Sequence, residues 1–170
     1  MGISIQDSSG SDARTGSSTS SDPDKVDSLA DYANFLRNIR RDYARAEEMF
    51  ERAITADPNH AHGLGCYADF LENVRRDYDR AEALYERAIT ADSTNVINLG
   101  NYANFLRNVR RDYDRAEEMY ERAIEADPNY AHSISNYAWF LQDIRRDYAR
   151  AEEMFERAIT ADPNHAHGLG

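Results

Sequence analysis

The sequence predicts an all-α protein in which antiparallel helix pairs stack into a solenoid. The first observation behind this prediction is a period of 35 residues, because Tyr32 recurs as Tyr67, Tyr102 and Tyr137. The second is that the runs Arg-Arg-Asp-Tyr and Glu-Arg-Ala-Ile recur in the same register. The third is that apolar residues within each period are spaced by three and four positions, as on one face of an α-helix. The chain therefore divides into four tandem repeats, at residues 22–56, 57–91, 92–126 and 127–161.

Each repeat is predicted to form two helices. In the first repeat, one face of the first helix collects the apolar residues Leu29, Tyr32, Phe35, Leu36 and Ile39. The second helix has small residues at Ala46 and Ala53, which let a neighbouring helix approach closely. The link at Arg41-Asp42 is short, so the two helices should be antiparallel neighbours.

Helix starts are predicted at the Asp-Pro pairs of the sequence. An Asp side chain can cap free amide groups, and Pro is tolerated at the first helical position. The pairs are Asp22-Pro23, Asp57-Pro58, Asp127-Pro128 and Asp162-Pro163, whereas Asp92-Ser93 lacks the Pro.

The two ends of the chain differ from the repeats. Residues 1–21 are rich in Ser, Asp and Gly, a composition that cannot bury enough apolar surface to fold, so a disordered tail is expected. Residues 162–170 are expected to begin a truncated fifth repeat, and residues 144–170 are identical to residues 39–65. Solenoids normally need a polar capping helix, so two interpretations stay open: a fragment of a longer array, or an end that stacks head to tail on another molecule.

Composition narrows the class of protein. The chain has 20 basic and 31 acidic side chains, so its formal charge is -11, which argues against binding nucleic acid. No apolar run approaches the ~20 residues of a membrane span, so no membrane partner is expected. The single Cys66 rules out an internal disulfide framework and favours a reducing, cytoplasmic location.

The second helix and its exit turn resemble the tetratricopeptide repeat. Ala46, Phe50, Ala53 and Pro58 stand at the small, aromatic, small and proline positions of that family. The matching sets are Ala81, Tyr85, Ala88 and Ser93; Ala116, Tyr120, Ala123 and Pro128; and Ala151, Phe155, Ala158 and Pro163, in which Ser93 is the one departure. The unit is a 35-residue variant of the usual 34, and the extra residue is expected between the helices. The resemblance implies a right-handed superhelical solenoid whose concave groove binds a protein or peptide.

That groove is expected on the first helices, opposite their apolar face, where the sequence varies between repeats. The residues assigned to it are Asn34, Arg37, Asn38, Asp69, Asn73, Asn101, Asn104, Arg107, Asn108, Asn136 and Trp139. An Asn amide offers both a donor and an acceptor, so a row of them could hold the backbone of an extended peptide. The alternative is that these amides bridge adjacent helices. Trp139 is interpreted as an exposed anchor for a ligand, and packing in the core is the alternative.

Other functions are less well supported by the residues. A clamp for a peptide's terminal carboxylate, as in chaperone-binding members of the family, needs a Lys where Ala30, Gly65 and Gly100 stand. The helical repeats of RNA-processing factors contain similar short sequence motifs, but the acidity of the chain disfavours a function in RNA processing. His60 and His62 are two apart and no cluster completes a metal site, and no nucleophile has a partner at catalytic spacing. No enzyme activity, cofactor or metal is therefore expected.

Overall fold

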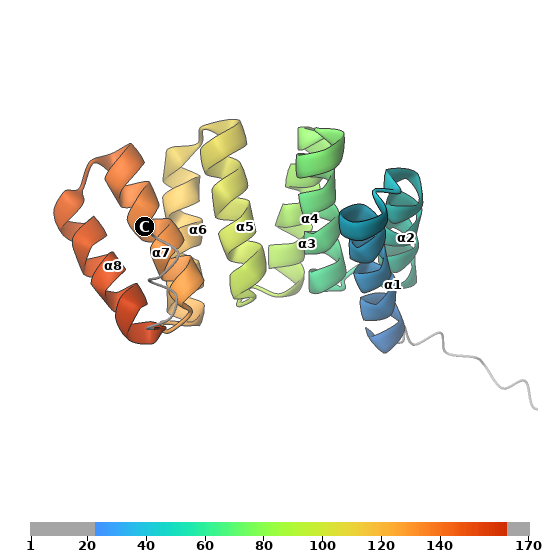
Figure 1. Cartoon of the computed structure of the whole chain (residues 1–170), viewed down its shortest axis with the longest axis horizontal. Coiled ribbons are helices and arrows are strands. Elements are labelled where there is room, and N and C mark those ends of the chain that lie inside the picture. Colours follow the sequence, from blue (N-terminus) through green and yellow to red (C-terminus); the bar gives the residue numbers. More distant parts are fainter. Residues whose placement is uncertain (1–22, 163–170) are drawn as a thin grey trace, which may run out of the picture.

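The computed structural model describes residues 23–162 and confirms the all-α solenoid. The expected tail at residues 1–21 lies outside the described residues, as does all but the first residue of the expected fifth repeat at 162–170. Within residues 23–162 the helices are α1 (Pro23–Phe35), α2 (Tyr43–Ala56), α3 (Ala61–Phe70), α4 (Tyr78–Ala91), α5 (Val96–Phe105), α6 (Tyr113–Ala126), α7 (Ala131–Phe140) and α8 (Tyr148–Ala161). They form four pairs, α1/α2 to α7/α8, that stack in chain order from the blue end to the red end of Figure 1.

Each first helix ends in a π-helical turn. The four turns are Leu36–Arg40, Leu71–Arg75, Leu106–Arg110 and Leu141–Arg145. In the first pair the amides of Arg41 and Asp42 both donate to the carbonyl of Leu36, and the Asp42 N to Leu36 O distance is 3.1 Å. A π-helical turn takes up one residue more than an α-helical turn. We therefore attribute the 35th residue of each unit to this turn, immediately before the link between the helices.

The residue after each π-helical turn is an arginine in the left-handed region. These residues are Arg41, Arg76, Arg111 and Arg146, with φ between 56° and 60°. A left-handed conformation costs an L-residue about 1–2 kcal/mol, whereas glycine adopts it freely. The second arginine of every Arg-Arg pair therefore ends the first helix with a strained backbone. The amino-acid sequence did not indicate this role.

Helix α1 begins at Pro23, as the Asp22-Pro23 pair predicted, but the later helix caps differ from the predicted ones. Asp42, Asp77, Asp112 and Asp147 cap the second helices, each by accepting a hydrogen bond from the backbone amide three residues later. Asp57 and Pro58 do not begin a helix, which corrects the prediction. Asp57 is instead the C-terminal cap of α2, and its Oδ1 accepts from the Asn59 amide at 3.0 Å to form a turn. The next helix begins after His60, whose Nδ1 accepts from the Gly63 amide at 3.2 Å.

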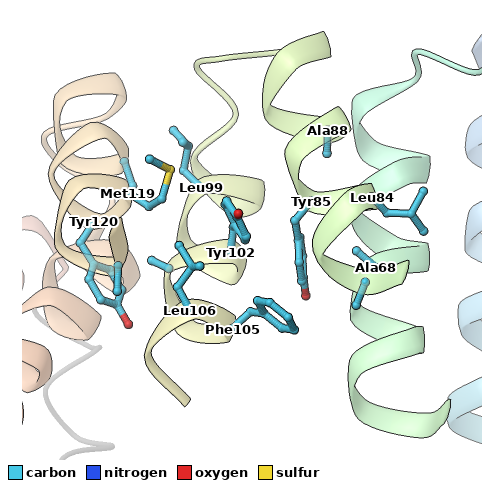
Figure 2. Close-up of a cluster of buried hydrophobic side chains, with 14 of the residues drawn as sticks. Ala68, Leu84, Tyr85, Ala88, Leu99, Tyr102, Phe105, Leu106, Met119 and Tyr120 are labelled. Atoms are coloured by element: carbon cyan, nitrogen blue, oxygen red, sulfur yellow. The ribbon is translucent and has the colours of Figure 1, made fainter. Parts of the chain in front are cut away.

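The hydrophobic core runs continuously through the pairs. Figure 2 shows Tyr85 of α4 projecting toward Tyr102 and Phe105 of α5, and both of its ring centroid distances are 5.6 Å. All three rings are buried, as are the small residues of the second helices. In the first pair Tyr32, on the apolar face predicted for the first helix, is 41% exposed, because no described pair precedes α1 to cover it. Phe35 and Ile39 are exposed for the same reason.

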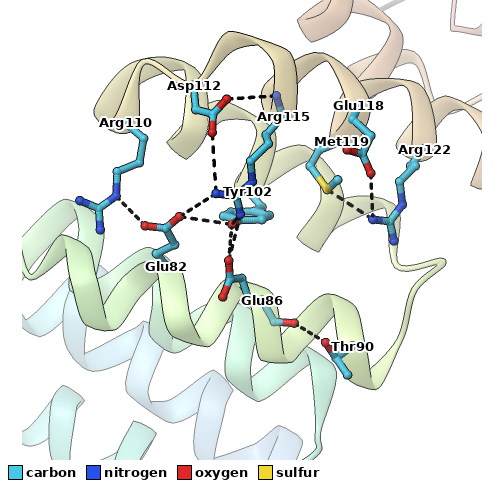
Figure 3. Close-up of polar contacts among 10 residues, drawn as sticks. All are labelled: Glu82, Glu86, Thr90, Tyr102, Arg110, Asp112, Arg115, Glu118, Met119 and Arg122. Carbon is cyan, nitrogen blue, oxygen red and sulfur yellow. Dashed lines mark hydrogen bonds and ion pairs between the residues drawn. The ribbon is translucent and has the colours of Figure 1, made fainter.

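Polar side chains join each pair to the next in a repeated arrangement, which we call the junction. At the junction between α4 and the third pair, the hydroxyl of Tyr102 donates to Glu86 at 3.1 Å and accepts from Arg115 (Figure 3). Arg110 donates through Nε to Glu82 at 2.6 Å, and its guanidinium also lies 5.5 Å from the centroid of the Phe105 ring. The other two junctions place a Tyr, two Arg and two Glu in the same way, around Tyr67 and around Tyr137.

A glycine permits one close approach between first helices. Asn98 of α5 is buried, and its Nδ2 donates to the carbonyl of Ala61 in α3 at 3.0 Å. A Cβ atom on Gly65 would lie 1.9 Å from Asn98 Oδ1, so a side chain at this position would displace the amide. At the equivalent Gly100 the nearest atom, Oγ of Ser133, is 3.7 Å away, which is an ordinary contact.

We expect opposite effects from adding one methyl group at these two equivalent positions. Gly65→Ala should lower the free energy of unfolding by about 1–3 kcal/mol, because the buried Asn98 amide loses its partner. Gly100→Ala should raise it by about 0.5–1 kcal/mol, because alanine favours the helix and meets no clash. Urea unfolding of both variants, followed by circular dichroism, measures the difference. Equal effects of the two substitutions would contradict this account of Gly65.

A second pair of variants tests the left-handed arginines. Arg146→Gly should raise the free energy of unfolding by about 1 kcal/mol, because glycine removes the strain at φ 58°. Arg146→Val should lower it by a similar amount, since a β-branched residue tolerates this region least. Arg146 is exposed, so neither change removes core packing. A destabilised glycine variant in urea unfolding would show that the arginine side chain, and not the backbone, is what matters here.

Candidate functional site

The predicted groove residues line three neighbouring hollows on the first helices and their π-helical turns. The first hollow is lined in part by Arg37, Asn38, Asp69 and Asn73. The second shares Asp69 and Asn73 with the first and extends to α5 and α7. The third shares Arg107, Asn108 and Asn136 with the second. Because neighbouring hollows share residues, they form one groove, which we call the first-helix groove; it is lined by Arg37, Asn38, Asp69, Asn73, Asn101, Asn104, Arg107, Asn108, Asn136 and Trp139.

Asn34 is the predicted site residue that lines none of these hollows. Its Nδ2 lies 3.5 Å from the Sγ atom of Cys66 in the next first helix. This contact is the bridging role that sequence reasoning gave as the alternative for the asparagines.

The part of the groove beside α1 and α3 is internally paired. Arg37 forms an ion pair with Asp69, and the same carboxylate accepts from Asn73 Nδ2 at 2.8 Å. The Nε of Arg37 also donates to Asn38 Oδ1 at 2.9 Å. Arg37 and Asp69 therefore neutralise each other across two helix pairs, and a ligand would have to break these bonds to use them.

The part of the groove beside α5 and α7 has unused hydrogen-bonding groups. Asn101 and Asn136 are half-buried and line the same hollow, and their side-chain amides make no hydrogen bond within residues 23–162. Asn104 differs, because its Oδ1 accepts from the hydroxyl of Tyr120 at 2.6 Å. A half-buried amide without a partner loses hydrogen bonds to water and regains them when a ligand supplies a donor and an acceptor.

Trp139 and Arg107 distinguish this part of the groove further. Trp139 stands where Asp69 stands two repeats earlier, so Arg107 has no carboxylate partner among residues 23–162, unlike Arg37. Arg107 keeps only a hydrogen bond from Nε to Asn108 Oδ1 at 2.9 Å. The Trp139 ring is partly exposed in the groove, and its other contact is an edge-to-face one with Phe155, with centroids 5.1 Å apart. The exposed side of the ring agrees with the interpretation of Trp139 as an anchor for a ligand. The contact with Phe155 agrees with the alternative, which is packing in the core.

The positions compared with a carboxylate clamp are buried. Ala30, Gly65 and Gly100 are buried beside a neighbouring first helix, and their counterpart Ser135 in α7 is also buried. They are small because neighbouring helices pack over them, as the contact between Gly65 and Asn98 illustrates. The expectation that a clamp lysine would stand at these positions is therefore corrected: a lysine there would be buried. Asn98 was missed by sequence reasoning, which had no signal to separate it from the other asparagines.

A carboxylate in the middle of the groove is held partly desolvated. Glu72 accepts a hydrogen bond from the hydroxyl of Tyr85 at 2.9 Å. Burial raises the pKa of Glu72, and the hydrogen bond from Tyr85 opposes that effect. Burial also raises the pKa of Tyr120 to about 12, against the nearby charge of Arg107. Burial likewise raises the pKa of Tyr85, so both tyrosines are neutral donors at physiological pH.

His62 and Cys66 lie next to each other on α3, with Nε2 3.7 Å from Sγ. A hydrogen bond to Cys66 raises the pKa of His62 to about 9, the carboxylates of Asp27 and Asp31 act in the same direction, and partial burial opposes them. Within residues 23–162 no three His, Cys, Asp or Glu residues are placed to hold a metal ion.

The Arg-Arg runs are divided between two roles. The first arginine of each later run, at 75, 110 and 145, pairs with a glutamate of the preceding repeat. The second arginine closes the first helix, as described above.

In the part of the chain that the structure describes, no helix has the length and apolarity to cross a bilayer.

The His62–Cys66 contact predicts a titration that one substitution should change. The ring of His62 is expected to titrate near pH 9, above its ordinary 6.5, and Cys66→Ala should move that midpoint back toward 6.5. Because the folded pKa is raised, the contact stabilises the fold fully below pH 6.5, and its contribution is lost as the pH rises through about 9. Histidine NMR resonances followed against pH in the wild-type chain and in the variant measure the midpoint. A His62 midpoint that Cys66→Ala leaves unchanged would contradict the assignment.

The tetratricopeptide repeat is the known sequence family that this chain matches. The family's pattern matches residues 40–96 and again residues 110–169. No curated protein matches the sequence.

Solved structures with the same fold share little sequence with this chain. The structure reported for pilF of Pseudomonas aeruginosa is 22% identical, with a TM-score of 0.72, and the alignment covers 83% of this chain and 63% of that one. A MamA structure is 16% identical, with a TM-score of 0.67 and coverage of 86% and 83%. The first repeat domain of Spaghetti (RPAP3), bound to the HSP90 peptide SRMEEVD, is 17% identical, with a TM-score of 0.62 and coverage of 73% and 96%. At these identities the similarity shows the fold alone.

Proposed function

Because the chain belongs to the tetratricopeptide repeat family, we propose that it is a non-catalytic scaffold that binds an extended peptide segment along the first-helix groove. The observation that supports this most is the pair of unused amides at Asn101 and Asn136, one repeat apart and lining one hollow. Two amides at this spacing can each donate to and accept from the backbone of an extended peptide. A neighbouring structure of the same fold holds a peptide, which makes the class of ligand reasonable.

The groove also suggests which side chains such a peptide has. Trp139 offers a partly exposed aromatic surface at the end of the groove, which suits an apolar side chain. Arg107 beside it has no carboxylate partner within residues 23–162 and suits an acidic group on the peptide. We propose that binding centres on α5 and α7, because the Arg37–Asp69 ion pair already occupies the other part of the groove.

The location of the protein is also a proposal. The free thiol of Cys66, half-buried beside His62, supports a reducing intracellular compartment. An enzymatic role has no supporting observation in the second hollow of the groove, whose ionisable residues are Asp69, Glu72, Tyr85, Arg107 and His132.

The proposal predicts that peptide binding depends on the two unused amides. Linear peptides selected from a displayed random library should bind the Asn101→Ala/Asn136→Ala variant at least about tenfold more weakly, because hydrogen bonds to the peptide backbone are lost. Isothermal titration calorimetry with the selected peptides measures the change. Asn59→Ala is the matched control, since this exposed turn residue lies outside the groove.

The only tryptophan of the chain provides an independent readout. A peptide that occupies the proposed part of the groove should alter the fluorescence of Trp139, whereas one that binds elsewhere should leave it unchanged. Selected peptides that bind the double variant as tightly as wild type, with no change in Trp139 fluorescence, would rule out this binding site.

A further inference from the structure

The two ends of the described solenoid expose the two halves of the junction. Inside the chain, each junction has two halves. The following helix pair contributes a Tyr, a Phe and two Arg, and the second helix of the preceding pair contributes an aromatic residue and two Glu. At the first junction, for example, the Phe50 ring lies 5.5 Å from Tyr67 and 5.3 Å from Phe70. The same geometry recurs at both later junctions, so it is a property of this repeat.

The first pair presents one half without its partner. We call this the N-terminal face; it consists of Tyr32, Phe35, Ile39, Arg40 and Arg45. The rings of Tyr32 and Phe35 stack at 6.4 Å, and Arg45 donates to the Tyr32 hydroxyl at 3.1 Å, as Arg80 does to Tyr67. This half is therefore already arranged as it is at the interior junctions. All five residues are exposed to solvent.

The last second helix presents the other half. We call this the C-terminal face; it consists of Tyr148, Glu152, Phe155, Glu156 and Ile159 on α8. Glu152 and Glu156 correspond to Glu47 and Glu51, which bind Tyr67 and its arginines at the first junction, but here both are exposed. Phe155 is partly exposed, whereas its counterparts at the three interior junctions are buried.

We infer that the C-terminal face of one copy binds the N-terminal face of a second copy through the same contacts that join the pairs within the chain. Two observations identify a second copy as the occupant. The charges are complementary, since Arg40 and Arg45 of one face would meet Glu152 and Glu156 of the other. The residues of α8 are also identical to those of α2, the helix on which the second pair is seen to pack.

The contact is heterologous, because different surfaces of the two copies meet. A heterologous contact that repeats without closing a ring produces an open row of molecules. Such a row would continue the solenoid, and the first-helix groove would pass from one copy to the next. This inference does not depend on peptide binding, because none of the residues of the two faces lines the groove.

Charge reversal tests the inference, with sedimentation velocity over a wide dilution series as the measurement. The wild-type chain should increase in weight-average mass above the 19.4 kDa monomer as its concentration rises. Glu152→Arg/Glu156→Arg should remain monomeric, since its C-terminal face would then repel Arg40 and Arg45 of another copy. Arg40→Glu/Arg45→Glu should also remain monomeric, because its N-terminal face would then repel Glu152 and Glu156 of another copy. An equimolar mixture of the two variants should associate again, because each reversed face meets its complement.

Controls separate this contact from general effects of charge. Glu48→Arg/Glu118→Arg has the same change in net charge at exposed sites outside both faces, and it should associate as wild type does. Equal circular dichroism spectra and unfolding midpoints show that each variant is folded. A wild-type chain that stays monomeric at every concentration would overturn the inference. So would association of either single-face variant by itself, or failure of their mixture to associate.

Discussion

The constraint on which the rest of this structure depends is the junction, in which a buried tyrosine places its hydroxyl between glutamates and an arginine. A tyrosine ring supplies a large apolar area, but its hydroxyl needs partners once it is removed from water. At the third pair, Tyr102 meets this requirement with Glu86 and Arg115, one from each side of the junction. The aromatic core and the polar rim are thereby fixed by the same residue, and the stacking of one pair on the next has a single register.

Because the contacts that join the pairs lie on particular sides of each first helix, the residues that line the groove can differ from repeat to repeat. Each first helix uses one side for the core, one for the junction and one, through Ala30, Gly65 and Gly100, for its neighbouring first helix. The remaining side faces the groove, and there Asp69 is replaced by Asn104 and then by Trp139. The residues of the groove therefore vary without disturbing the stack.

Much of the fold could be predicted from the sequence, because a 35-residue period leaves few alternatives to stacked helix pairs. The errors have identifiable physical causes. Asp57 was expected to cap a helix because it precedes Pro58, but the same side chain can cap an Asx turn, and a sequence does not distinguish the two uses. Tyr32 was placed on the apolar face of the first helix by its spacing, but burial requires a neighbouring pair as well as an apolar residue. The left-handed arginines gave no signal, since glycine is the residue that normally marks such a position.

The sequence could indicate which residues line the candidate site, but it could not indicate which of their side chains lack a hydrogen-bond partner. The family resemblance, the spacing and the variation between repeats together selected eleven residues, and ten of them line the groove. Whether an amide is free depends on partners that belong to other helices, as Asn104 shows with Tyr120 and Asn34 with Cys66. A one-dimensional pattern cannot report those partners, so Asn101 and Asn136 could be distinguished from their neighbours only in three dimensions.

Trp139 shows how one departure from the period changes two surfaces together. By replacing the carboxylate that pairs with Arg37 in the second repeat, it leaves Arg107 without such a partner in the groove. By placing a ring 5.1 Å from Phe155, it also supports the aromatic residue at the centre of the C-terminal face. An ideal repeat would present the same groove at every pair and the same face at every junction. The substitution therefore concentrates an unpaired cation and an aromatic surface at one end of the solenoid, beside the helix that the next molecule would have to contact.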